Sequence, residues 1–186
     1  MTNSAAHEVA GAAFDHALWK ALILAGLDGM ITTLDSTTIV AATGRKQADK
    51  AYQPREISQA TNWPSVVLEV AYSESAAKLQ ADVRFWLHNS NDHVKVVFAI
   101  KVKQRTPMIT IEKWKRDPNG QGYIQQRAII SRHRGNVTIH GAPITIEFED
   151  LFLRSGKTRP DKDIELDVDM LRDLAAETWS KQEFPA

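Results

Sequence analysis

The sequence predicts an α/β fold in which a sheet is organised around one buried strand and is covered by helices. Ser65 to Val70 is a nearly unbroken apolar and β-branched run, typical of a strand covered on both faces. An amphipathic helix is predicted from Ser75 to Leu87, with apolar residues at helical spacing: Leu79, Val83, Trp86 and Leu87. Glu69 interrupts the strand with a charge, which is costly to bury unless the carboxylate is paired or binds a cation.

The segments before this strand predict a helix, a hairpin and a short extended piece. Apolar residues recur at helical spacing from Phe14 to Leu27, and glycines there supply stop signals. Met30 to Ala42 is rich in β-branched residues around Asp35-Ser36, a pair suited to a tight turn, so a hairpin is expected. Asp49 stands just ahead of an extended piece that ends near Pro54.

The segments after the predicted helix supply most of the sheet. Alternating apolar residues predict strands, and Asp117-Pro118-Asn119-Gly120 is a strong turn signal between two of them. Helical spacing and an acidic cap at Asp167 or Asp169 predict a last helix. The expected elements are strands at Val94 to Val102, Met108 to Trp114 and about Tyr123 to Ile130, sheet-margin pieces at 137–139 and 143–146, and helical pieces at Glu149 to Leu153 and Asp169 to Lys181.

The composition is that of one globular domain. The 186 residues include 43% hydrophobic and 25% charged residues, enough for a sizeable core, and the formal net charge is zero. A nucleic-acid site would therefore need a local basic patch. Cysteine is absent, and the sequence shows no signal peptide and no apolar run of membrane-spanning length. We expect an intracellular, soluble protein of the cytoplasm or nucleus that is not secreted and contacts no membrane.

Two carboxylates are the strongest candidates for chemistry. Asp49 lies at the start of one extended segment and Glu69 lies within the next strand, so both side chains converge if these strands are neighbours. A hard divalent cation would relieve their mutual repulsion and bring water ligands that can be activated. The alternative is structural, with Asp49 at a solvated edge and Glu69 satisfied or exposed at a strand end. Spacing alone leaves both interpretations open.

Several motifs together resemble a known superfamily. They are Lys46-Gln47-Ala48-Asp49, Pro54, Trp63-Pro64-Ser65-Val66-Val67-Leu68-Glu69-Val70, Ser73-Glu74-Ser75, Leu79, Asp82 and Trp86-Leu87. The pattern, from about Lys46 to Val102, resembles the restriction-endonuclease-like PD-(D/E)XK superfamily, and more narrowly its Uma-type branch and related uncharacterised fungal proteins. The resemblance implies a mixed central β-sheet flanked by α-helices in one domain over residues 1–186, with a core at about 14–153 and a C-terminal helix at about 169–181.

The resemblance also implies a metal site. Asp49 matches the metal-binding aspartate and Glu69 the acidic residue of the (D/E)-x-K element, while the Val70 carbonyl can add a ligand. The implied cofactor is Mg²⁺ or Mn²⁺. Ala71 occupies the place of the family lysine, which helps to position and polarise the attacking water. The expected enzyme is therefore an endonuclease with a displaced or lost catalytic lysine.

Lys78 is the candidate for a displaced lysine, because Uma-type proteins resemble cases in which the lysine has moved to the following helix. Asp82 lies four residues later on the same helical face, so an ion pair between the two is the alternative. Gln80 can take an accessory polar position or be a surface residue. Three further residues lie near the first helix, where the superfamily often has an additional acid, although a solvated helix face is the favoured interpretation: Glu8, Asp15 and His16.

The resemblance implies a divalent-metal-dependent nuclease that hydrolyses phosphodiester bonds, with DNA favoured over RNA and a homodimer left open. The alternative is a catalytically inactive nuclease-fold module that binds nucleic acid or protein, which Ala71 and the zero net charge favour. Basic residues concentrate between Lys101 and Arg134, where they form either a phosphate-binding face or a solvated sheet face. The histidines lack metal-ligand spacing, which disfavours zinc.

Overall fold

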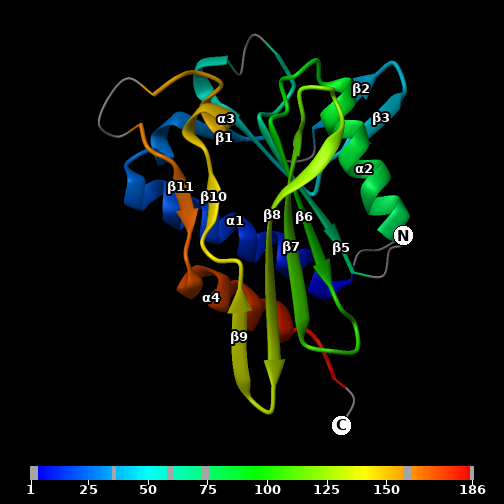
Figure 1. The fold of residues 1–186 in the computed structure, drawn as a ribbon, viewed down its shortest axis with the longest axis vertical. Helices are drawn as coiled ribbons and strands as arrows, with labels where there is room; N and C mark the ends of the chain where they lie inside the picture. The colour runs from blue at the N-terminus through cyan, green and yellow to red at the C-terminus, as the bar shows by residue number, and fades with distance from the viewer. Residues whose placement is uncertain (1–3, 35–36, 58–60, 73–75, 157–160, 185–186) are drawn as a thin grey trace.

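The computed structural model describes residues 4–34, 37–57, 61–72, 76–156 and 161–184. In these ranges the protein is built on a central sheet of seven strands in the order β1-β4-β5-β6-β7-β8-β9 (Figure 1). The sheet is mixed, because β5 pairs with β6 in parallel while the other neighbouring pairs are antiparallel. The predicted α/β fold, with a mixed central sheet flanked by helices, is confirmed.

The strands of the main sheet are β1 (Ile31–Thr33), β4 (Lys50–Pro54), β5 (Val66–Ala71), β6 (Val96–Val102), β7 (Met108–Arg116), β8 (Gly122–His133) and β9 (Asn136–His140). Two small antiparallel sheets pair β2 (Thr38–Ala41) with β3 (Gly44–Gln47), and β10 (Ile144–Ile146) with β11 (Ile164–Leu166). The helices are α1 (Ala5–Ala25), α2 (Ala76–Asn89), α3 (Phe148–Phe152) and α4 (Val168–Trp179), with short 3₁₀ turns η1 (Asp28–Met30) and η2 (Arg55–Ile57).

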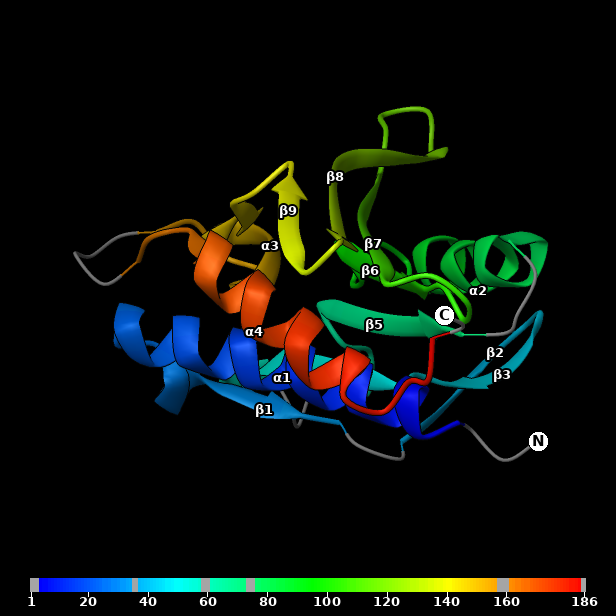
Figure 2. The same ribbon diagram turned by 90° about the horizontal axis from the view of Figure 1, so that it is seen from below.

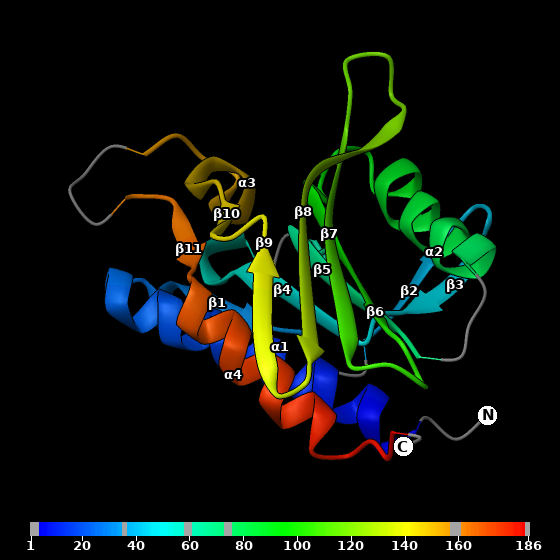
Figure 3. The same ribbon diagram turned by 60° about the horizontal axis from the view of Figure 1, so that its bottom comes forward.

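The helices cover the two faces of the sheet unequally. Helices α1 and α4 lie together along one face, while α2 lies on the other (Figures 2 and 3). On the first face Phe14 of α1 packs against Phe98 of β6, with ring centroids 5.0 Å apart. On the second face Val83 of α2 shares a core cluster with Val67 of β5. Every residue of β5 is buried because this strand lies between the two helical layers, as its apolar run predicts.

The first helix begins at Ala5, nine residues before the predicted start at Phe14. Ser4 caps it by accepting a hydrogen bond from the His7 amide at 3.2 Å. The added turns bury small side chains, Ala6, Ala10 and Ala13, which bring the backbone close to the sheet. Alanine carries little apolar signal, so periodicity alone missed them.

The hairpin predicted over Met30 to Ala42 is wrong. Strand β1 pairs with β4 in the main sheet, whereas β2 pairs with β3. The predicted turn at Asp35-Ser36 lies outside the described residues. β-branched residues favour an extended backbone but do not determine which strand it pairs with. In this protein β2 pairs with β3, and Ile39 of β2 packs into the apolar cluster under α2. Thr43 ties the β2–β3 hairpin to α2 through a 2.8 Å hydrogen bond to Asn89.

The remaining elements follow the sequence closely. The turn at 117–120 joins β7 to β8, with the Gln121 amide donating to the Asp117 carboxylate at 2.7 Å. Asp167 caps α4 by accepting from the Met170 amide at 2.8 Å, and α3 matches the predicted helical turn. The piece at 137–139 is the edge strand β9, but 144–146 pairs with β11 outside the main sheet, so its predicted place at the margin is wrong. The caps predicted at Ser73 or Ser75 lie outside the described residues.

None of the helices in the described ranges has both the length and the apolar character that a membrane crossing requires. The one-domain organisation stays a prediction.

Candidate metal and catalytic site

Strand pairing brings the Asp49 carboxylate to the strand that carries Glu69. Asp49 directly precedes β4, and β4 pairs antiparallel with β5 so that Lys50 faces Leu68. The Asp49 Oδ2 atom accepts a hydrogen bond from the Val70 backbone amide at 2.7 Å. Val70 therefore holds Asp49 beside Glu69 through its N–H group, and a metal-binding role for its carbonyl stays a prediction.

Glu69 is held in a nearly dry environment. It is 5% exposed, and its Oε1 atom accepts a 2.5 Å hydrogen bond from the Trp86 indole N–H of α2. Lys46 of β3 places its ammonium nitrogen 3.4 Å from the same oxygen. Burial raises the pKa of Glu69 to about 8, and the negative charge of Asp49 adds to this rise while Lys46 opposes it. Burial therefore favours the protonated form of the Glu69 carboxyl, and a nearby positive charge favours the ionised form.

The free energy of unfolding of the metal-free protein should depend on pH through the protonation of Glu69. Because the folded pKa of Glu69 is raised from 4.5 to about 8, the stability linked to the proton is present below pH 4.5 and lost as the pH rises toward 8. Glu69→Gln carries no titrating group there, so its free energy of unfolding should fall less than that of the wild type over this range. Urea unfolding in EDTA at several pH values measures the difference. Parallel pH profiles for the two proteins would contradict the prediction, and the exposed Glu149→Gln variant is the control.

A lysine that the sequence did not single out lies closest to this carboxylate. Lys46 pairs with Glu69 and also with Asp82 of α2, whose Oδ1 atom lies 2.9 Å from the ammonium nitrogen. Lys78 lies one turn before Asp82, 53% exposed and 3.8 Å from its Oδ2 atom. The Lys78–Asp82 ion pair, one of the two alternatives, is therefore present, while a catalytic role for Lys78 stays a prediction. Lys46 reaches Glu69 because the β2–β3 hairpin packs against α2. Lys46 and Glu69 are far apart in the sequence, so the sequence alone does not reveal this contact.

The N-terminal turn of α1 contacts the other carboxylate. His7 places Nε2 3.4 Å from the Asp49 Oδ2 atom, and hydrogen bonding to Asp49 raises the pKa of His7. Glu8 and Gly11 join these residues around a cavity of about 220 Å³ beside Asp49. Sequence reasoning missed His7, because it lies outside the predicted helix and belongs to no histidine motif.

The other candidate residues on α1 and α2 form no hydrogen bond or ion pair with Asp49 or Glu69 in the part of the chain that the structure describes. The Asp15 carboxylate accepts a 2.9 Å hydrogen bond from the Tyr52 hydroxyl. His16 lies 3.8 Å from Glu177 of α4, at the surface. Gln80 is exposed on α2. His7 thus contacts Asp49 and Lys46 contacts Glu69, while Asp49 reaches β5 through the Val70 amide. Asp15 and His16 contact other elements.

The donor set fits Mg²⁺ or Mn²⁺ in chemical type. Within the described residues, no group of three or more histidine, cysteine, aspartate or glutamate side chains is arranged to hold a metal. Mg²⁺ is nevertheless commonly held by one or two carboxylates, with water and substrate phosphates completing its shell. Asp49 and Glu69 supply two such carboxylates.

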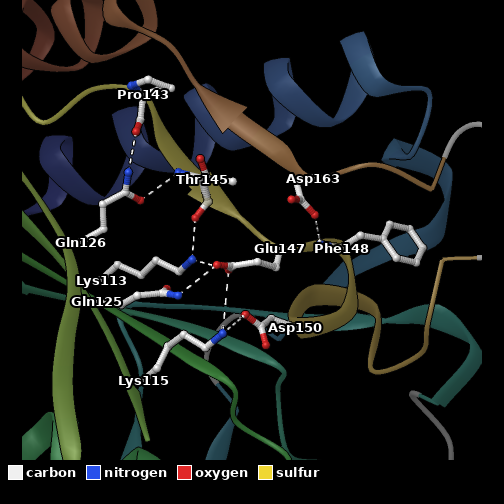
Figure 4. A network of polar contacts seen from close by, with 10 residues as sticks. All are labelled: Lys113, Lys115, Gln125, Gln126, Pro143, Thr145, Glu147, Phe148, Asp150 and Asp163. Carbon is white, nitrogen blue, oxygen red and sulfur yellow. Dashed lines mark hydrogen bonds and ion pairs between the residues drawn. The ribbon is translucent and has the colours of Figure 1, made fainter. Parts of the chain in front are cut away.

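Part of the basic segment is buried rather than available to a ligand. Lys113 of β7 is 1% exposed and donates to the Thr145 carbonyl at 2.6 Å and to the Glu147 carboxylate (Figure 4). Lys115 donates to Asp150 of α3 at 2.6 Å in the same network. Burial disfavours the charge of Glu147, but hydrogen bonds with Lys113, Asp150 and the backbone together with the Lys113 charge outweigh it and lower the pKa of Glu147 to about 2. Lys113 therefore belongs neither to a phosphate-binding face nor to a solvated one, and Lys115, which is partly exposed, is held by Asp150.

The fold is similar to that of solved structures. No protein-family profile matches the sequence, and no curated protein does. One similar structure is a "putative nuclease belonging to DUF820" from Anabaena variabilis, with a TM-score of 0.52 and 6% identity. The match covers 96% of this chain and 84% of that one, so it extends over the whole architecture. The two proteins therefore share an α/β fold with a mixed central sheet flanked by helices. At this identity the likeness shows the fold alone.

Proposed function

We propose that the protein is a divalent-metal-dependent nuclease that hydrolyses phosphodiester bonds of nucleic acid. The observation that carries the proposal is the placement of Asp49 on the backbone amide of Val70, beside the buried carboxyl of Glu69 and the ammonium of Lys46. Two acids and one lysine from separate segments thus contact neighbouring positions of β5 or lie on it. Stability alone does not require a buried acid here, because an apolar residue in the place of Glu69 would avoid the desolvation penalty of the carboxyl.

Each residue of the site has a role in this proposal. Asp49 and Glu69 hold Mg²⁺ or Mn²⁺, with the Val70 carbonyl as a further ligand. A bound ion supplies Lewis-acid activation of the phosphodiester and of water. Lys46 supplies a positive charge for the anionic phosphate as the reaction proceeds. Trp86 fixes the Glu69 carboxyl and His7 fixes that of Asp49, through the hydrogen bond and the close contact already described.

The two lysines can be separated by matched substitutions. Lys46→Gln should lower the rate constant of hydrolysis by about 10²-fold or more, the usual effect of removing a charge or donor that stabilises a transition state. Lys78→Gln should leave the rate near that of the wild type, because Lys78 is mostly exposed and pairs with Asp82. Single-turnover cleavage of DNA and of RNA with Mg²⁺ or Mn²⁺ makes the measurement, and thermal unfolding checks both folds. The opposite order of effects would assign the catalytic lysine to Lys78.

A catalytically inactive nucleic-acid-binding module is the second candidate. The observation that favours it is the double ion pair of Lys46, whose ammonium joins Glu69 and Asp82 with Ala71 in the place of the family lysine. In this case Lys46 takes the place of the cation. Nucleic-acid binding in EDTA without hydrolysis in Mg²⁺ or Mn²⁺ would support the module and end the nuclease proposal.

Membership of the Uma-type branch stays a prediction; because that resemblance places the catalytic lysine on α2, loss of activity in Lys78→Gln rather than in Lys46→Gln would support it. DNA is the favoured substrate over RNA on the resemblance alone. A homodimer and a location in the cytoplasm or nucleus stay predictions.

A further inference from the structure

A row of residues leads from the candidate site across the sheet. Strand register places Glu69 of β5 beside Ala99 of β6, Ala99 beside Glu112 of β7, and Glu112 beside Arg127 of β8. Residues directly paired across strands point to the same face of a sheet, so this row lies on the face that α2 partly covers. Three strand spacings separate Glu69 from Arg127, which is about 14 Å.

Glu112 joins two cations at the middle of this row. It is buried, and its carboxylate accepts from the Lys101 ammonium at 2.8 Å and from the Arg127 guanidinium at 3.0 Å. The Trp114 indole N–H adds a third donor at 3.1 Å. One negative charge is thus shared by two positive charges, and Arg127 remains 49% exposed. The cluster presents an oriented net positive charge to solvent.

The rest of this face carries hydroxyl and imidazole groups. In Figure 1, strands β8 and β9 show the face that lies opposite α1 and α4. Beyond α2, no helix of the described residues covers this face (Figure 2). The hydroxyls of Ser131 and Thr138 lie 2.9 Å apart across these strands, and His140 at the end of β9 is exposed. Within β7, β8 and β9, Glu112 is the only acidic residue. A face with cations and neutral donors and no unpaired carboxylate suits a polyanion.

We propose that this face, defined by Lys101, Glu112, Arg127, Ser131, Thr138 and His140, binds the sugar-phosphate backbone of a nucleic-acid strand. The proposal rests on the proposed function in one respect, namely that the strand is the substrate of the candidate site. Phosphate contacts position a strand without reading its sequence, so binding should depend on salt and little on base composition.

Binding in EDTA tests the face without cleavage. Fluorescence anisotropy with labelled single-stranded and duplex DNA and RNA gives the dissociation constant at several salt concentrations. Arg127→Gln should weaken binding several-fold and lower the slope of log K against log salt by about one. Arg172→Gln is the matched control, because Arg172 is 50% exposed and paired with Asp169 on α4, away from this face.

A second variant avoids the buried Glu112. His140→Glu adds a negative charge at an exposed position and should weaken binding at low salt while the melting temperature stays unchanged. Polyglutamate as a competitor separates nucleic acid from acidic protein; displacement of the strand at equal charge concentration would overturn the proposal. Wild-type affinity in both variants, or no binding by the wild type, would also overturn it. If Arg127→Gln weakens binding but the wild type cleaves no nucleic acid, the binding face is supported and the nuclease proposal is wrong. If cleavage depends on Asp49 but binding does not depend on Arg127, the nuclease proposal is supported and the binding face is wrong.

Discussion

Replacing Asp49 by asparagine is expected to lower metal-dependent hydrolysis of nucleic acid on the order of 10³-fold, because a metal ligand underlies several kcal/mol of transition-state stabilisation and each 1.36 kcal/mol is tenfold. The substitution keeps the shape of the side chain. The asparagine carbonyl can still accept the hydrogen bond from the Val70 amide, which is 2.7 Å long in the wild type. The anionic charge that a divalent cation requires is lost. The fold should therefore survive while the chemistry does not.

The comparison of Asp49→Asn with the wild type requires the metal affinity as well as the rate of hydrolysis. Calorimetric titration with Mn²⁺ should show weaker binding by Asp49→Asn than by the wild type, independently of turnover. Asp92→Asn is the control, because Asp92 is exposed and pairs with Lys95 away from the site. Hydrolysis at the wild-type rate by Asp49→Asn, with wild-type metal affinity, would remove Asp49 from the site and end the nuclease proposal.

The second large effect concerns stability. Glu147→Gln leaves the buried ammonium of Lys113 with the Thr145 carbonyl but without its carboxylate partner. Breaking a buried ion pair by removing one member costs about 3–5 kcal/mol, and we expect the lower end because Glu147 is itself partly exposed. Urea unfolding at neutral pH measures the loss, and Glu149→Gln on the exposed side of α3 is the control.

The pH dependence gives this prediction a signature of its own. Burial lowers the pKa of Lys113, so the folded state disfavours its proton and stability rises as the pH approaches the range where unfolded lysine also loses its proton. Removal of Glu147 should strengthen this dependence, so the deficit of Glu147→Gln should shrink in alkaline buffer. A deficit equal to that of Glu149→Gln, or one that is constant with pH, would show that the network contributes no specific stability.

Local patterns predicted most of the fold because they depend on neighbours in the chain. The apolar run around Val66 to Val70 and the stripe on α2 each report burial directly, and both elements are present. Pairing is different: nothing local distinguishes β1 joining β4 from β1 joining β2. The candidate site shows the same limit. The sequence predicts Asp49 and Glu69 as a pair, but Lys46 reaches Glu69 only because a hairpin outside the main sheet packs on α2.

The acid in the centre of β5 also has a consequence for how the protein can change. Position 69 lies among the buried residues Val67, Trp86 and Ala99. Replacing Glu69 by leucine or methionine would therefore remove the desolvation penalty of the carboxyl while filling a similar volume. Selection for thermal stability alone would therefore drive this position toward an apolar residue. Variants recovered from a screen for heat resistance should be enriched in such changes at Glu69 and depleted of activity, which is the trade-off that functional sites impose on their scaffolds.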